Sequence, residues 1–143
     1  MATVNAEVEL PASAEKVWAV LSDPHRFDEW LTIHAGWSGD IPSELVAGTK
    51  LTEKVMLLGM ANKIEWTVDA FDAPSLVKMS GSGMAGVKVG LSIEVTSTGD
   101  TSTASIETMF EGQMVVGALG KAVEKDAKKN LDESMAKLAS LVA

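Results

Sequence analysis

Few side chains in this sequence can carry acid–base chemistry, and His34 is one of only two histidines. His34 follows a short helical segment and lies near Trp30 and Trp37, where a strand is predicted to begin. A neutral imidazole at such a position donates or accepts a hydrogen bond. Its partner is either a carbonyl or hydroxyl group of a ligand or a nearby backbone group, and the sequence leaves both interpretations open.

Glu53 is the second candidate, because it interrupts an apolar alternation. Leu51, Val55 and Leu57 share one phase of a predicted strand, and Glu53 falls in the same phase. A carboxylate on the inner face of a sheet is costly unless it is paired, which invites a functional explanation. The alternative is a β-bulge that shifts the register and turns Glu53 toward solvent.

The remaining candidates would contact a ligand rather than react with it. Asn62 stands beside a predicted turn, where it either orients a polar group of a ligand or terminates the turn. The apolar candidates share inward strand phases or the start of the last helix: Trp37, Trp66, Met79, Phe110 and Met114. Each can be explained as a core residue, but together rings and thioethers form a surface that accepts varied apolar shapes.

Metal and cofactor chemistry is not expected. The chain has no cysteine, and His25 and His34 are too poorly spaced for a common ligand set. Tyrosine is also absent, which removes the phenol as an acid or base. We therefore expect no metal site and no cofactor.

The elements that must position these residues follow from hydrophobic periodicity. A helix is predicted to begin after Ser13 as N-cap, and a second short one to begin at Asp23-Pro24 and to end near Trp30. Alternation with a period of two predicts strands over residues 3–10, 33–39, 50–58, 62–71, 76–82, 87–95 and 102–111. Short turns between alternating segments indicate an antiparallel meander.

The C-terminal segment has helical periodicity instead. Apolar residues recur every three or four positions, at Val116, Leu119, Val123, Ala127, Leu131, Met135, Leu138 and Val142. This stripe predicts a long amphipathic helix that packs on the apolar face of the meander. The fold class is therefore α+β, a helix grip in which a curved antiparallel sheet of about seven strands wraps around the C-terminal helix, with residues 1–143 forming one domain.

The opening stretch from Val8 to Trp30, VELPASAEKVWAVLSDPHRFDEW, resembles the START/Bet v 1-like (SRPBCC) superfamily. The similarity is to its bacterial polyketide cyclase/dehydrase and lipid-transport branch, and the order of elements matches over the whole chain. The resemblance implies an apolar ligand held between the sheet and the long helix. Most such proteins bind without catalysis, some are aromatase/cyclases, and others act on protein partners.

The net charge of the chain limits the classes of partner that it can bind. The chain of 143 residues has a formal net charge of −8, which argues against nucleic acid and anionic membranes as main partners. No signal peptide and no apolar stretch long enough for membrane insertion is apparent, so a cytoplasmic monomer or weak homodimer is expected.

Three functions remain. The first is binding or transport of a small, mainly apolar ligand, such as a lipid, a polyketide or an aromatic metabolite, in an internal cavity. The second is a polyketide aromatase/cyclase-like enzyme with His34 or Glu53 as general base and Asn62 orienting a carbonyl group. The third is a module that binds a protein partner. The shortage of reactive groups favours binding over catalysis.

Overall fold

The computed structural model describes residues 2–42, 45–57, 59–83, 86–112 and 116–142. Met114, one of the predicted ligand contacts, lies outside these described residues. The elements are β1 (Ala2–Leu10), α1 (Ala14–Leu21), the 3-10 helix η1 (Pro24–Arg26), α2 (Phe27–Trp30), β2 (His34–Ser38), β3 (Lys50–Leu57), β4 (Met60–Asp72), β5 (Leu76–Ser82), β6 (Lys88–Thr98), β7 (Thr101–Glu111) and α3 (Gly117–Val142).

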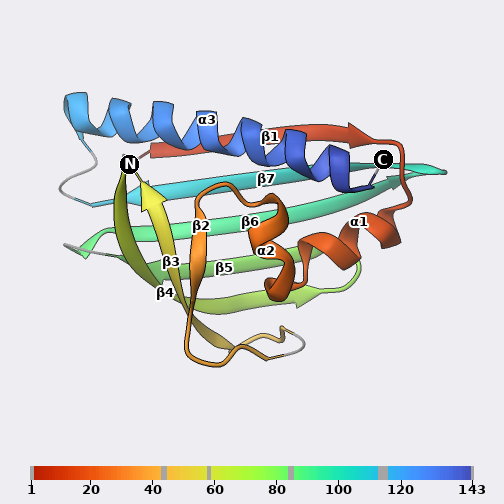
Figure 1. Cartoon of the computed structure of the whole chain (residues 1–143), viewed down its shortest axis with the longest axis horizontal. Helices are drawn as coiled ribbons and strands as arrows, with labels where there is room; N and C mark the ends of the chain where they lie inside the picture. The colour runs from red at the N-terminus through yellow and green to blue at the C-terminus, as the bar shows by residue number, and fades with distance from the viewer. Residues whose placement is uncertain (1, 43–44, 58, 84–85, 113–115, 143) are drawn as a thin grey trace.

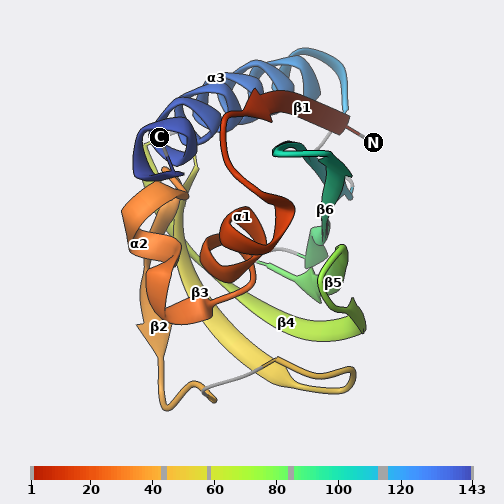
Figure 2. The ribbon, with the colours of Figure 1, turned by 90° about the vertical axis from the view of Figure 1, so that its right-hand side faces the viewer.

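The seven strands form one antiparallel sheet in the order β1–β7–β6–β5–β4–β3–β2. Figure 2 shows the sheet curling around α1, with α3 lying across the open side next to β1. The predicted order of elements and the helix-grip α+β fold are confirmed.

Capping side chains define where α1 and η1 begin. The Ser13 side chain accepts a hydrogen bond from the Lys16 amide and caps α1. The Asp23 carboxylate caps η1 by accepting the His25 amide at 3.0 Å, and Pro24 follows at the first helical position. These caps place the aromatic residues of α2 directly before β2.

The core lies between the inner face of the sheet and the helices. Alternate residues of β6, namely Val89, Leu91, Ile93 and Val95, are all buried, as the alternation predicts. From α1, Trp18 reaches Phe71 of β4 with ring centroids 5.4 Å apart. The inner face is therefore closed by α1 at one end of the sheet.

The later turns of α3 are packed more closely against the body of the protein than the first turns. Ala127, Leu131, Met135, Leu138 and Val142 are buried, but Val116 and Leu119 are 60% and 42% exposed. The prediction that the whole apolar stripe packs on the sheet is wrong for the first turns. The connection between α2 and β2 meets α3 at Ser134, in the second half of the helix.

α3 also packs along β1, the edge strand, where the Lys128 ammonium group donates a hydrogen bond to the Asn5 carbonyl oxygen at 3.1 Å. None of the helices in the described part of the chain is long and apolar enough to cross a membrane.

Candidate functional site

The first strand of the site, β2, begins with a bulge that aims His34. The pairing with β3 shifts between His34 and Gly36, so that His34 lies opposite Val55 and Trp37 opposite Glu53. The turn before it is held by hydrogen bonds from the His34 amide to the Leu31 carbonyl oxygen, at 3.0 Å, and from the Met56 amide to the Ile33 carbonyl oxygen, at 2.9 Å.

Glu53 faces the interior. Pairing between β3 and β4 runs without a shift from Lys50 opposite Thr67 to Leu57 opposite Met60. Glu53 therefore keeps the phase of its apolar neighbours and is only 2% exposed. The bulge considered for β3 is wrong, since the irregularity lies in β2.

The carboxylate of Glu53 accepts two hydrogen bonds from buried ring N–H groups. His34 Nδ1 lies 2.5 Å from Oε2, and Trp66 Nε1 lies 2.9 Å from Oε1. The side chains of His34 and Glu53 are 4% and 3% exposed. In its carboxylate form Glu53 has only acceptor lone pairs, so Nδ1 of His34 carries the proton that it shares with Glu53.

This arrangement distinguishes the two ring nitrogens of His34. Both oxygens of Glu53 are occupied, whereas His34 Nε2 makes no hydrogen bond to the described residues. A carboxylate that fixes the tautomer of an imidazole is a recurring device for orienting a histidine toward a metal or a substrate. Of the His34 nitrogens, Nδ1 is therefore held by Glu53, and Nε2 is the one left for any further hydrogen bond.

Aromatic rings enclose the imidazole. The ring of Trp37 lies 5.0 Å from that of His34 between centroids, and Phe27 lies 6.0 Å away. Trp37 is itself fixed, because its indole N–H donates to the Pro24 carbonyl oxygen at 2.8 Å. These contacts hold the imidazole plane in place.

A small space lies between the sheet and the middle of α3. Its volume is about 20 Å³, and its walls are Leu31, Ile33, Thr108, Phe110, Ala127, Asn130, Leu131 and Ser134. On this measure about 10–15 Å³ is enough to hold one water molecule, whereas ligand pockets have volumes of about 300–1,000 Å³. The space is therefore far smaller than the ligand cavity expected from the sequence.

Polar side chains of Thr108, Asn130 and Ser134 line this space. Thr108 Oγ1 is buried and has no hydrogen-bond partner among the described residues, as is also true of Nε1 of Trp30, which lies elsewhere in the core. Ser134 of α3 accepts the Thr32 amide at 2.9 Å and joins the helix to the connection between α2 and β2. An unpaired buried polar group costs free energy that a ligand or a water molecule can offset.

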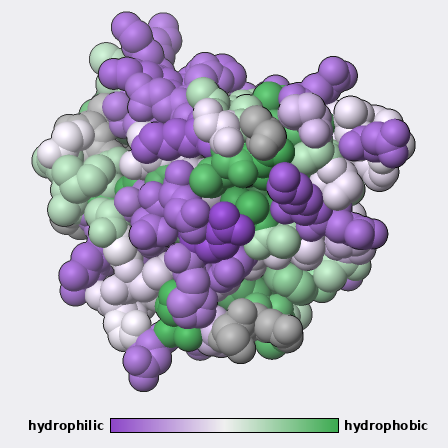
Figure 3. Space-filling model, turned by 45° about the vertical axis from the view of Figure 1, so that its right-hand side comes forward, coloured by the Kyte–Doolittle hydropathy of each residue, from purple (hydrophilic) through white to green (hydrophobic). Residues whose placement is uncertain are grey.

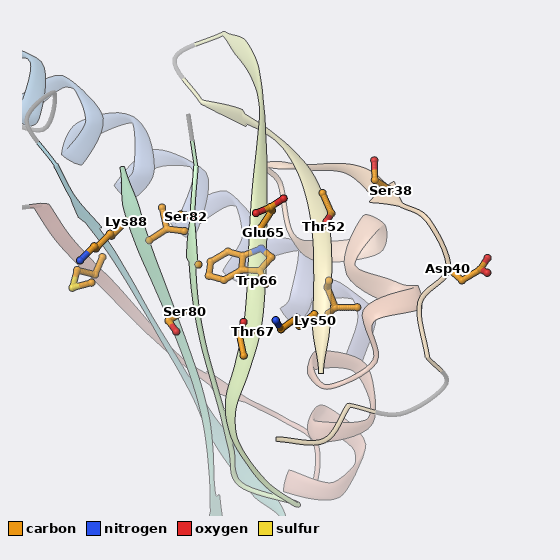
Figure 4. Close-up of a pocket in the computed structure, with 14 residues that line it drawn as sticks. Ser38, Asp40, Lys50, Thr52, Glu65, Trp66, Thr67, Ser80, Ser82 and Lys88 are labelled. Carbon is orange, nitrogen blue, oxygen red and sulfur yellow. The ribbon is translucent and has the colours of Figure 1, made fainter. Parts of the chain in front are cut away.

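A much wider hollow lies on the other side of the sheet. Figure 4 looks onto this outer face, with the helices behind the strands, and shows short polar side chains between the charged groups of Lys50, Glu65 and Lys88. Its volume is about 690 Å³. Neither His34 nor Glu53 lines it, so it is separate from the buried pair.

Comparison with known proteins identifies the family. The model of a family described as "Polyketide cyclase / dehydrase and lipid transport" matches residues 1–143. The chain belongs to this family.

Relatives of the polyketide cyclase/dehydrase and lipid transport family occur in Mycobacterium tuberculosis. The chain is 31% identical over 141 residues to the uncharacterized protein Rv1546, with 99% of each chain covered. It is also 31% identical over 143 residues to a protein named Toxin Rv0910, with 100% of this chain and 99% of that protein covered.

Solved structures agree on the fold. A START superfamily protein from Mycobacterium smegmatis is similar with a TM-score of 0.78 and 20% identity, over 98% of this chain and 96% of that one. A protein from Geobacillus kaustophilus has a TM-score of 0.74 and 18% identity, over 98% and 94%. At these identities the similarity shows the fold alone.

The other predicted ligand contacts of this family member are dispersed. Asn62 Nδ2 donates to the Met60 carbonyl oxygen at 3.0 Å, within its own hairpin. Met79 is buried in the core of the sheet, and Phe110 is a wall of the small space under α3. The structure brings together His34, Glu53, Trp37 and Trp66, but it does not bring Asn62 or Met79 to the same polar group.

The bond between His34 and Glu53 is the feature that sequence reasoning missed. Both residues were singled out, but as alternatives rather than partners. The useful signal was Glu53 itself, since an inward carboxylate requires donors nearby. Thr108, Asn130 and Ser134 were missed altogether, because polar residues of small or moderate size do not interrupt a hydrophobic pattern strongly.

Proposed function

We propose that the protein binds a small, mainly apolar molecule between the inner face of the sheet and α3. The observation that carries the proposal is the incomplete packing under α3. A buried hydroxyl group, Thr108 Oγ1, has no partner there within the described part of the chain, and two apolar residues at the start of the helix, Val116 and Leu119, are exposed.

Binding requires the first half of α3 to move away from the sheet, because the space of about 20 Å³ holds no molecule larger than water. Segments with few buried apolar contacts open at low cost in free energy. The exposed first turns of α3 meet that condition, whereas the later turns are anchored by buried residues such as Leu138. A ligand would cover apolar side chains of the helix and bond to Thr108.

The test uses the neutral fluorescent probe N-phenyl-1-naphthylamine and a pair of matched variants on the same helix. Ala127→Leu fills the space under α3, whereas Ala122→Leu places the same side chain on the exposed face. We expect Ala127→Leu to weaken probe binding more than tenfold and Ala122→Leu to leave it unchanged.

Thr108→Val provides a variant of nearly equal volume in case Ala127→Leu fails to fold. It removes the hydroxyl group without opening a cavity. If Ala127→Leu, Ala122→Leu and Thr108→Val all bind the probe as tightly as the natural chain does, the probe binds elsewhere and the proposal is contradicted. Native mass spectrometry that finds no co-purifying molecule, together with no binding across a panel of lipids and polyketides, would also oppose the proposal.

Acid–base catalysis is a second candidate, and the specific observation in its favour is the orientation of His34 by Glu53. In that case His34 Nε2 is the general base, and Glu53 is a positioning residue. The inner location of the pair is consistent with proton abstraction from a poly-β-ketone.

The two histidines give a matched test of catalysis. His34→Ala should abolish cyclisation of a poly-β-ketone substrate, while His25→Ala, which changes a side chain that is 50% exposed, should not. Probe binding should survive in both variants. Equal product patterns for His34→Ala and the natural chain would remove His34 as the base.

A further inference from the structure

The exposed apolar side chains in the described part of the chain are concentrated at one end of the molecule. Met56 and Met60 flank the turn between β3 and β4, and Val116 and Leu119 stand at the start of α3. Figure 1 shows this hairpin and the first turns of α3 at the same end of the long axis. Of the large apolar residues exposed in the described ranges, Val46 alone lies elsewhere.

Figure 3 shows another face, on which hydrophilic and hydrophobic side chains are mixed, with hydrophobic surface at its centre and in its lower part. At the end described above, Met60 and Val116 are 59% and 60% exposed. Large apolar side chains that are exposed at one end of a molecule make that end a candidate interaction site.

Two lysines lie beside the exposed methionines. Lys54 and Lys63 are directly opposite each other across β3 and β4, and both are exposed. Like charges in such a cross-strand pair destabilise a sheet. They line a hollow of about 580 Å³ on the outer face together with Glu65, which forms no ion pair with either lysine within the described part of the chain. An anion placed at this hollow would relieve the repulsion.

α3 adds basic residues at the same end. Lys121 and Lys125 follow Leu119 along the exposed first turns, with Glu111 and Glu124 as nearby carboxylates in the sequence. The opposite end carries acidic turns, at Asp72 before β5 and at Asp100 between β6 and β7 (Figure 1). The four lysines of this end stand against four carboxylates, those of Glu65, Glu111, Glu124 and Asp126, so this end is near neutral and the net charge of −8 is carried by the rest of the chain.

We propose that this end of the protein docks on the surface of a bilayer that contains anionic lipids. Met56, Met60, Val116 and Leu119 enter the boundary between head groups and acyl chains, and Lys54 and Lys63 contact lipid phosphates. Apolar side chains combined with basic residues are the chemistry of reversible interfacial binding. The inference does not rest on the proposed ligand function, since docking requires no bound molecule.

Co-sedimentation of the full chain with large unilamellar vesicles tests the proposal. We expect binding to vesicles of equimolar phosphatidylglycerol and phosphatidylcholine, and much weaker binding to phosphatidylcholine alone. Lys54→Gln combined with Lys63→Gln should weaken binding about 25-fold, from about fivefold for each lysine near an anionic surface. Met60→Ser combined with Leu119→Ser should weaken it more than tenfold.

Matched controls use the same substitutions at other places. Val46→Ser alters an equally exposed apolar residue, and Lys16→Gln combined with Lys78→Gln removes two lysines elsewhere on the surface. These variants should bind like the natural chain. All substitutions are at exposed positions, and circular dichroism checks that each variant is folded.

Three results would overturn the proposal. The first is no binding to anionic vesicles at low salt. The second is an equal loss of binding in the control variants. The third is binding of soluble glycerol phosphate to Lys54 and Lys63 as tightly as vesicles bind, which would make the hollow a site for small phosphates. Absence of probe binding in solution would oppose the proposed function without affecting these outcomes.

Discussion

Replacing Glu53 by glutamine should reverse the tautomer of His34. Trp66 Nε1 can only donate, and it lies 2.9 Å from Oε1 of Glu53. In Glu53→Gln the amide oxygen must therefore face Trp66, which turns the amide NH₂ group toward His34. His34 Nδ1 must then accept a hydrogen bond, and the proton of the neutral ring moves to Nε2.

The cost to stability follows from the same geometry. Both bonds survive in Glu53→Gln as neutral bonds, which are about half as strong as charge-assisted ones, so we expect a loss of about 1–2 kcal/mol in the free energy of unfolding. In Glu53→Leu the ring nitrogens of His34 and Trp66 lose their partner. At about 1–3 kcal/mol for each buried unsatisfied group, the loss is about 2–6 kcal/mol in total.

Long-range ¹H–¹⁵N correlation spectra of the imidazole rings measure the tautomer directly. The chain has two histidines, and His25→Gln assigns their signals. His25 serves as the internal control, since its side chain is 50% exposed and does not contact Glu53. Urea denaturation gives the free energies.

A His34 ring that keeps its proton on Nδ1 in Glu53→Gln would refute this reasoning. So would a natural chain in which Nδ1 carries no proton, because the carboxylate would then not be the acceptor. If His34 is a general base, Glu53→Gln should also abolish catalysis, since Nε2 changes from an acceptor to a donor.

Other positions give simpler expectations. Gly81→Ala should lower the free energy of unfolding by more than about 2 kcal/mol in urea denaturation, because the added Cβ would overlap a backbone carbonyl of β4. In the control Gly90→Ala the added Cβ meets only a flexible side chain, so the free energy of unfolding should change by less than about 1 kcal/mol. Ser134→Ala should cost about 1–2 kcal/mol in the same assay, since a backbone amide of the connection between α2 and β2 loses its acceptor. The hydrogen bond from Arg26 and its positive charge lower the pKa of Glu29. The pair therefore stabilises the fold above the ordinary carboxyl pKa, and this stabilisation is lost as the pH falls through the lowered pKa. Arg26→Gln should raise the pKa of Glu29 in an NMR titration.

The sheet could be predicted from the sequence because its strands alternate clearly. The inward residues of β6, such as Leu91 and Ile93, are separated by polar or small residues, so the face that each residue of the strand takes followed from the local pattern. The helical period of the last segment was equally clear. Periodicity shows that α3 has an apolar stripe, but it does not show which part of the stripe meets other elements, so the exposure of Leu119 was unpredictable.

The candidate site was predicted only in part. Residues 39–49 separate β2 from β3, and such a long connection fixes no register between the strands. The bulge after His34 changes that register further. His34 and Glu53 could therefore be recognised as unusual one by one, but their contact depends on strand pairing that no local pattern encodes.

The bulge in β2 also bears on how the protein avoids aggregation. β2 is an edge strand of only five residues, and an edge that is short and irregular is a poor template for strand pairing with another molecule. Deleting Ala35 would remove the extra residue and straighten an edge that other chains could extend, while His34 could stay opposite Val55 and Trp37 opposite Glu53. The bulge lets His34 and Trp37, three residues apart in the chain, lie on the same face as Glu53, and the same irregularity makes the edge a poor template for other chains.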